Sequence, residues 1–289
     1  MKKIALISPS SPSPDLTPDT IKQLHALLND AGYRIHFESH ALDSYRYLAG
    51  SDEDRATDIM RAFTDDTVDI VMTTRGGYGS PRLLDRLDYE VLKKSPKPFL
   101  TLSDGTALQT ALYTLSGITG YSGIQATFWL KGKNDALIQT ALSALKGALP
   151  PIPIQKVFSP GQSTGIMLGG NLTVFCALLG SPYFPDMRNK VLVIEDVNEP
   201  PYKVDRMLTQ LRLAGIFNQI SGLVLGDFSS CIAKDSPDGT VEDVFKDFFE
   251  NAPFPVVQVN YGHRNRDTVV PIGKKVLIDT DHHIVKEIP

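Results

Sequence analysis

The length, composition and charge of this chain exclude several classes of protein. Its 289 residues can bury one large core or two of moderate size, and 29 Lys and Arg against 33 Asp and Glu leave a formal net charge of −4. Because no basic block gathers charge, neither nucleic acid nor an anionic membrane is expected as a partner. The first apolar run, residues 4–7, is too short for a signal peptide, and no run is long enough to span a bilayer. We therefore expect a cytoplasmic protein in which Cys176 and Cys231 are reduced thiols.

The first half of the chain alternates apolar strands with amphipathic helices. Strands are predicted over residues 3–7, 34–38, 68–73 and up to Ser103, and helices over residues 18–31, 53–63 and 81–87. Strands this apolar, separated by helices, predict a parallel sheet with helices on both faces. We expect a Rossmann- or flavodoxin-like α/β domain over residues 1–148. In such sheets ligands bind beyond the carboxyl ends of the strands, where the loop 75–79 and Ser103 both lie.

Proline and serine residues are concentrated between residues 149 and 165, and we interpret this segment as a linker. Beyond it, the pattern predicts helices over residues 173–179, 204–214 and 241–249, strands over 190–195, 222–226 and 256–260, and a terminal hairpin over 269–285. These elements predict a smaller C-terminal domain of mixed α/β structure over residues 166–289.

The segment 97–108 is typical of a nucleophile elbow. An apolar strand runs directly into Ser103 and a helix begins at once, which would expose the serine oxygen and turn the next backbone N–H toward an oxyanion. Thr101 stands where the G-x-S-x-G elbow has its first glycine. The segment alone favours a second interpretation, because Ser followed by Asp at a helix start is a common N-cap.

A serine nucleophile needs a base, and a histidine base needs an orienting acceptor. His263 follows an apolar strand and Gly262, which permits an unusual backbone angle, although a loop histidine held by the backbone explains it equally well. Glu195 closes four consecutive apolar residues at the edge of a buried sheet and is the best candidate acceptor. Asp196 and Glu199 lie nearby, and all three carboxylates could instead be solvated.

The loop 75–79 holds glycines at 76, 77 and 79, directly after a predicted strand. Phosphate binding is disfavoured, because the P-loop lysine and the spacing of the dinucleotide fingerprint are both absent. Supplying a backbone N–H to an oxyanion hole is the better use of this loop, and a plain turn is the alternative.

Several short blocks occur together in one order along nearly the whole chain. They are the opening IALISPS at residues 4–10, RGGYG at 75–79, LSD at 102–104, GGN at 169–171, IED at 194–196, GH at 262–263 and PIG at 271–273. This order resembles the LD-carboxypeptidase, or muramoyltetrapeptide carboxypeptidase, family of serine peptidases. The branches of that family include the microcin C self-immunity hydrolases.

The resemblance implies roles for particular residues. Ser103 would be the nucleophile, His263 the general base and Glu195 its orienting carboxylate. The oxyanion hole would use the N–H of Asp104 and one from the glycine loop, for which we choose Gly77. The resemblance also implies a homodimer, and an enzyme that needs neither a metal nor a cofactor.

The expected reaction is hydrolysis of an L,D peptide bond, with release of terminal D-alanine from murein tetrapeptide in cell-wall recycling. Arg75 is a candidate receptor for the terminal carboxylate of this small peptide substrate. One alternative is an immunity-type hydrolase of aminoacyl-nucleotide amides. The resemblance implies an aromatic residue that stacks on the base in that branch, and Trp129, the only tryptophan, lies outside the matched blocks. Another is a non-catalytic small-ligand-binding protein in which Ser103 only caps a helix.

The chain departs from the family pattern around the elbow. Thr101 and Leu102 replace Gly-Tyr, Gly105 replaces a common Ile, Gln109 replaces a frequent His, and residues 121–125 stand where a His-Gly-Pro segment is often found. Because these positions surround the nucleophile and the substrate pocket, we expect them to affect specificity more than the catalytic residues.

Overall fold

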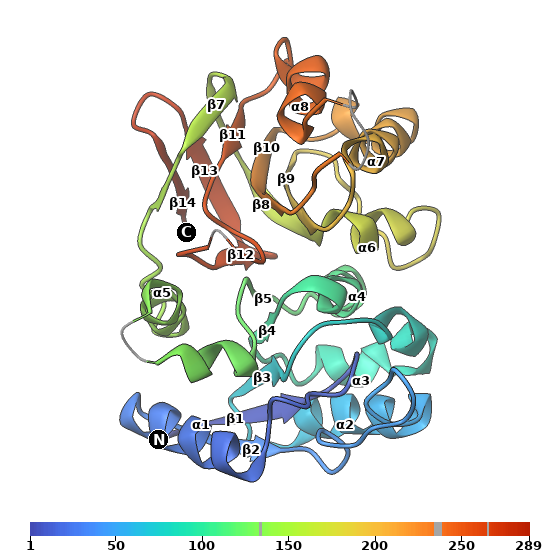
Figure 1. The fold of residues 1–289 in the computed structure, drawn as a ribbon, viewed down its shortest axis with the longest axis vertical. Helices are drawn as coiled ribbons and strands as arrows, with labels where there is room; N and C mark the ends of the chain where they lie inside the picture. The colour runs from blue at the N-terminus through green and yellow to red at the C-terminus, as the bar shows by residue number, and fades with distance from the viewer. Residues whose placement is uncertain (133–134, 234–238, 265) are drawn as a thin grey trace.

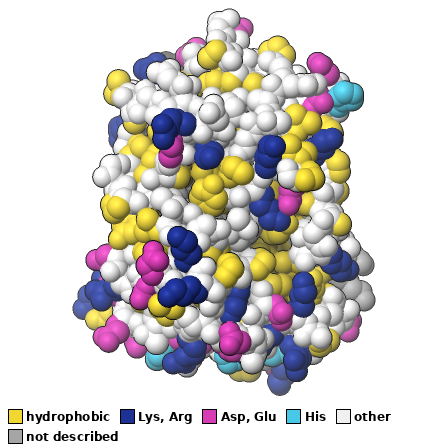
Figure 2. Space-filling model, turned by 180° about the vertical axis from the view of Figure 1, so that it is seen from behind, with side chains coloured by type: hydrophobic (Ala, Val, Ile, Leu, Met, Phe, Trp, Pro, Cys, Tyr) yellow, Lys and Arg dark blue, Asp and Glu magenta, His cyan; other side chains and the backbone are white. Residues whose placement is uncertain are grey.

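Two β-sheets, each flanked by helices, lie at opposite ends of the molecule in the computed structural model, which describes residues 1–132, 135–233, 239–264 and 266–289 (Figure 1). Helix α4 (Thr106–Ser116) lies between them and packs against both the N-terminal sheet and the C-terminal one (Figure 1). In the described part of the chain, no helix is long and apolar enough to cross a membrane. Lys and Arg side chains are scattered over the rear face of the molecule among other types (Figure 2).

The N-terminal sheet has six strands in the order β12-β5-β4-β3-β1-β2. Its strands are β1 (Lys2–Ile7), β2 (Tyr33–Phe37), β3 (Ile70–Thr73), β4 (Phe99–Thr101), β5 (Gly120–Ser122) and β12 (Val270–Ile272). The first five strands are parallel and follow the flavodoxin order 2-1-3-4-5, which confirms the expected fold of this half. β3 is buried at every position, as its unbroken apolar sequence predicts.

Two of the helices that cover this sheet lie where the amphipathic patterns predict them, over 18–31 and 53–63. The helical elements of this half are α1 (Pro18–Asp30), α2 (Asp52–Thr64), α3 (Tyr89–Lys93), α5 (Ala136–Leu145) and the 3₁₀ turns η1 (Ser80–Arg86), η2 (Ser103–Gly105) and η3 (Ala126–Lys131). Thr17 caps α1 by accepting a hydrogen bond from the Thr20 N–H, and Pro18 occupies its first turn. The segment 81–87, expected as a helix, is the 3₁₀ turn η1.

The C-terminal sheet is mixed, as expected, and has eight strands in the order β6-β14-β13-β8-β9-β10-β11-β7. They are β6 (Ile152–Pro153), β7 (Lys156–Ser159), β8 (Gln162–Asn171), β9 (Lys190–Val197), β10 (Gly222–Ser229), β11 (Val256–Gln258), β13 (Lys275–Asp279) and β14 (Ile284–Glu287). β8 to β11 are parallel, and the outer strands are antiparallel. Helices α6 (Leu172–Ala177), α7 (Pro201–Leu213) and α8 (Val241–Phe249) and the turn η4 (Ile216–Asn218) complete this half.

Two expectations about the C-terminal half need correction. Residues 149–165, expected as a linker, contain β6, β7 and the start of β8. Because β6 and β7 are the two edge strands of their sheet, prolines are tolerated in and beside them. The expected hairpin over 269–285 is also different, since β12 leaves to pair antiparallel with β5 and only β13 and β14 form a hairpin. The C-terminal half therefore contributes one strand to the N-terminal sheet, and the chain passes between the two sheets three times.

Candidate active site

Ser103 lies two residues after the carboxyl end of β4, at the first position of η2. Its φ is 65°, in the left-handed region that a non-glycine residue rarely adopts, and such strain is typical of a serine presented on an elbow. The cap positions of η2 and α4 are Leu102 and Gly105, and neither end has a side-chain cap bond. The helix-cap interpretation of Ser103 is therefore wrong.

The glycine loop packs on this elbow. A Cβ on Gly76 would lie 2.7 Å from Cβ and 3.1 Å from Oγ of Ser103, so a side chain there would collide with the nucleophile. Gly77 has φ +121°, and its missing side chain leaves room for Ser11 rather than for Ser103. The two glycines thus allow the loop to approach both Ser103 and the segment after β1, and the oxyanion role of Gly77 stays a prediction.

His263 pairs with a buried carboxylate. Its Nδ1 lies 2.6 Å from Oε2 of Glu195, a fully buried side chain on β9. Gly262, at φ +142°, brings the histidine loop so close that a Cβ there would lie 3.2 Å from the same oxygen. Burial acts to lower the pKa of His263, but the hydrogen bond and the charge of Glu195 outweigh it and raise that pKa above its ordinary value. Burial also raises the pKa of Glu195, opposed by its hydrogen bonds from His263 and Asn171, so the two groups titrate as a pair.

The neighbouring acid Asp196 is committed to a different task. It accepts hydrogen bonds from the Thr173 N–H at 2.9 Å, from the Thr173 hydroxyl at 2.7 Å and from the Val197 N–H at 2.8 Å. Glu199, the third candidate, pairs with Lys203 at 3.1 Å. Of the three acids that the sequence left as candidates, Glu195 is therefore the one that pairs with His263.

Hydrogen bonds lead from the elbow helix to the carboxylate. Oγ1 of Thr106, one turn after Ser103, accepts from the Asn171 N–H at 3.0 Å, and Nδ2 of Asn171 donates to Glu195 Oε1 at 3.3 Å. Sequence reasoning gave neither Thr106 nor Asn171 a role, although Asn171 stands in the matched block GGN at 169–171. The described residues contain no hydrogen bond between Ser103 and His263, so their pairing stays a prediction. Apo active sites commonly hold such groups apart until substrate binds.

Arg75, the expected receptor for a terminal carboxylate, precedes the glycine that packs on Ser103. Its Nη1 donates to the carbonyl of Pro12 at 3.2 Å, which holds the guanidinium beside the loop after β1. Its role toward substrate stays a prediction.

Two departures from the family pattern explain one another. The Thr101 side chain fills the space where a Cβ on Gly105 would lie, and Gly105 has an ordinary φ of −61°, so the conflict is purely steric. A glycine at position 101 would leave room for the isoleucine that the family commonly has at 105. Thr101 and Gly105, next to the nucleophile in sequence, are therefore a sterically matched pair.

We expect Gly105→Ala to destabilise the protein by about 1–3 kcal/mol, because the added methyl group overpacks a buried site. In the Thr101→Gly background the same substitution should cost less, by about 1 kcal/mol or more. Urea unfolding of the wild type, both single variants and the double variant measures this coupling. Additive effects of the two substitutions would contradict the matched pair.

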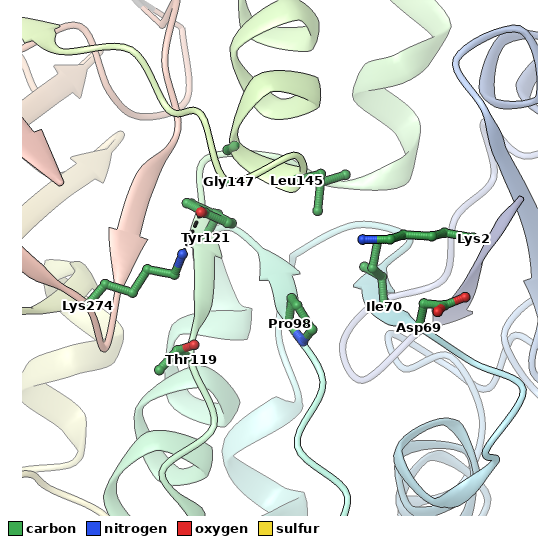
Figure 3. Close-up of a pocket in the computed structure, with 10 residues that line it drawn as sticks. Lys2, Asp69, Ile70, Pro98, Thr119, Tyr121, Leu145, Gly147 and Lys274 are labelled. Carbon is green, nitrogen blue, oxygen red and sulfur yellow. Dashed lines mark hydrogen bonds between the residues drawn. The ribbon is translucent and has the colours of Figure 1, made fainter. Parts of the chain in front are cut away.

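A cavity of about 310 Å³ lies away from this site (Figure 3). Its walls include Lys2, Ile70, Pro98 and Thr119. These residues lie at the amino ends of the parallel strands, whereas Ser103 follows a carboxyl end. Lys274 also lines the cavity and pairs with Tyr121 at 2.6 Å (Figure 3). It pairs with Glu287 at 2.9 Å as well. In the described ranges, no group of three or more His, Cys, Asp or Glu side chains could hold a metal ion.

Comparisons with known proteins show the family to which the chain belongs. Residues 4–123 match the LD-carboxypeptidase N-terminal domain, and residues 164–278 match the LD-carboxypeptidase C-terminal domain. Murein tetrapeptide carboxypeptidase of Pseudomonas aeruginosa is 30% identical over 293 residues, which cover 96% of this chain and 93% of that protein. The crystal structure of muramoyltetrapeptide carboxypeptidase from Oxalobacter formigenes superposes with a TM-score of 0.85, at 28% identity over 98% of this chain and 97% of that one. An MccF-like protein from Bacillus anthracis gives 0.86, at 26% identity over 99% and 96%.

Proposed function

Because this chain belongs to the LD-carboxypeptidase family, we propose that it is a serine carboxypeptidase that releases the terminal D-alanine of murein tetrapeptide. The observation that carries the proposal is the pairing of His263 with the buried Glu195 carboxylate, on the domain that packs against the strained Ser103 elbow. A serine held at a strand end and a histidine oriented by a carboxylate are the components of acyl transfer.

The contacts assign a role to each nitrogen of His263. Because Nδ1 faces the Glu195 carboxylate, it carries the proton, and Nε2 is left as the base. Nε2 takes the proton of the Ser103 hydroxyl as Oγ attacks the carbonyl of the L,D bond, and Glu195 stabilises the imidazolium that forms. The imidazolium then protonates the departing amine of D-alanine and leaves an acyl-enzyme. Water, deprotonated by the same histidine, hydrolyses that ester and frees Ser103.

The oxyanion and the substrate carboxylate need separate receptors. The N–H groups of Asp104 and Gly77 would stabilise the oxyanion, since one follows the nucleophile and the other lies next to Gly76. Arg75 would bind the terminal carboxylate of the peptide. We place the enzyme in the cytoplasm as a homodimer, where tripeptide and D-alanine would return to cell-wall synthesis.

A second function shares the same chemistry. The likeness to the MccF-like protein supports hydrolysis of an amide between an aminoacyl group and a nucleotide. Against it stands Trp129, which is only 2% exposed and packs in the core of the N-terminal half, so it cannot stack on a base. A non-catalytic binding protein is the alternative from another class.

A product assay separates these three functions. The wild type should release D-alanine from L-Ala-γ-D-Glu-meso-diaminopimelate-D-Ala and leave the L-alanine epimer of that peptide intact, as measured by chiral mass spectrometry. Cleavage of aspartyl sulfamoyl adenosine alone would instead establish the nucleotide amide as substrate. If neither compound is cleaved and a fluorophosphonate fails to label Ser103, the binding protein is the better description.

A further inference from the structure

The side chain of Asp104 follows the nucleophile but takes no part in the proton transfers described above. It is only 2% exposed. Its Oδ2 accepts two hydrogen bonds, from the Ser10 hydroxyl at 2.5 Å and from the Ser80 N–H at 2.7 Å. In addition, the Asp104 carbonyl accepts from the Ser80 hydroxyl at 2.5 Å. One residue is thus bound to two segments that lie 94 and 24 positions away in the chain.

Those two segments flank the glycine loop. Ser10 belongs to the segment after β1, and the adjacent Ser11 accepts from the Tyr78 N–H at 3.2 Å and fills the space beside Gly77. Ser80 immediately follows the loop and begins η1. The Asp104 carboxylate therefore holds Ser10, whose neighbour packs on Gly77, and Ser80, which follows the loop. These two contacts fix the position of the glycine loop and of its N–H groups.

A buried arginine holds the same loop from its other side. Arg55, on α2, donates to the carbonyls of Pro9 and Gly79, and its Nη1–Gly79 distance is 3.1 Å. Its charge is balanced by Asp52 at 2.5 Å. The loop is thus held by the Arg55 guanidinium and by the Asp104 carboxylate. Of these two groups, only Asp104 belongs to the elbow itself.

We propose that the Asp104 carboxylate is a positioning group of the reaction, which holds the glycine loop in register with the Ser103 elbow so that their N–H groups converge on one oxyanion. The inference rests on the proposed function for its substrate, but the arrangement serves any reaction in which an oxyanion forms at Ser103. The group contacts neither the substrate nor the reacting atoms, and it acts through Ser10 and Ser80. Its loss should therefore reduce kcat, with little effect on KM.

The test compares Asp104→Ala with Asp104→Asn. An amide oxygen in the Oδ2 position still accepts from both Ser10 and Ser80, so asparagine should restore most of the rate. We expect Asp104→Ala to lower kcat by about 10²-fold, with KM within about threefold of the wild type, and Asp104→Asn to stay within about tenfold in kcat. Ser10→Ala, which removes one of the two donors, should lose about tenfold and serves if Asp104→Ala does not fold.

Asp58→Ala is the matched control, because Asp58 is also 2% exposed and accepts the His40 N–H at 2.8 Å, on the α2 side of the sheet. It should lose stability in thermal melts yet keep the wild-type kcat. The second measurement is the rate at which a fluorophosphonate modifies Ser103, since phosphonylation also develops an oxyanion in the same hole. That rate should fall in Asp104→Ala in parallel with kcat.

The labelling rate separates this inference from the proposed function. If the wild type is labelled but releases no D-alanine, the substrate assignment fails, and the fall in labelling of Asp104→Ala still supports the positioning role. Folded Asp104→Ala with a wild-type labelling rate would overturn the role, as would failure of asparagine to restore it. A wild type that is neither labelled nor active would overturn both.

Discussion

Ser103→Ala is expected to lower the turnover of D-alanine release by about 10³-fold or more, because the reaction loses the oxygen that forms the acyl-enzyme. The fold should be unaffected. Alanine keeps the Cβ that Gly76 accommodates and carries the same backbone strain at φ 65° as serine does. Turnover, measured by released D-alanine, should therefore fall without a matching fall in the melting temperature.

The control for this substitution is Ser116→Ala, at the far end of α4, the helix that follows the elbow. Ser116 is also largely buried and donates its hydroxyl to the Tyr89 carbonyl at 3.0 Å, so its loss removes a hydrogen bond without touching the elbow. It should keep wild-type turnover. Near-normal release by Ser103→Ala would exclude the acyl-enzyme mechanism and return attention to a different nucleophile.

Much of the order of strands and helices was predictable because those elements carry their own periodic pattern, whereas α3, β5, α5 and β8 were not predicted. α8, predicted over 241–249, begins and ends at those residues, with a capping box at Thr240 and a strongly amphipathic sequence. Pairing between distant strands has no such local signal. β12 is three residues long, and nothing in its own sequence says that it joins β5 rather than β13. The expected linker failed for the same reason, since edge strands and proline-rich linkers look alike in sequence.

The candidate site was likewise predictable only in part. Ser103, Glu195 and His263 could be selected because strand ends are where a sheet presents chemistry, and the matched blocks added the order in which they occur. Their partners could not, because a hydrogen bond between Asn171 and Glu195 or between Ser10 and Asp104 joins segments that only the fold brings together. Whether Ser103 is a cap or an elbow depended on one backbone angle, which residue types alone do not determine.

Glu195→Gln is expected to have two separable effects, on the size of kcat and on its dependence on pH. The carboxylate holds the Nδ1–H of His263 and stabilises the imidazolium, and loss of such an acid costs about 10⁴-fold in a comparable triad. His263 accepts a proton only when neutral, so activity should rise with pH through the pKa of this residue. Since Glu195 raises that pKa above its ordinary value of 6.5, the acidic limb of the wild-type profile of kcat/KM should lie above pH 6.5.

In Glu195→Gln the negative charge is gone, whereas the burial that opposes protonation of His263 remains. The pKa should therefore fall, and the acidic limb of the residual activity should move to lower pH while its plateau stays about 10³- to 10⁴-fold below the wild type. Glu287→Gln is the matched control, because Glu287, on β14, also neutralises a partner, Lys274 at 2.9 Å, but beside the cavity at the amino ends of the N-terminal strands. Its profile should coincide with that of the wild type. A limb that moves to higher pH in Glu195→Gln, or does not move, would mean that Glu195 does not set the protonation of the base, and the triad would have to be assigned to another carboxylate.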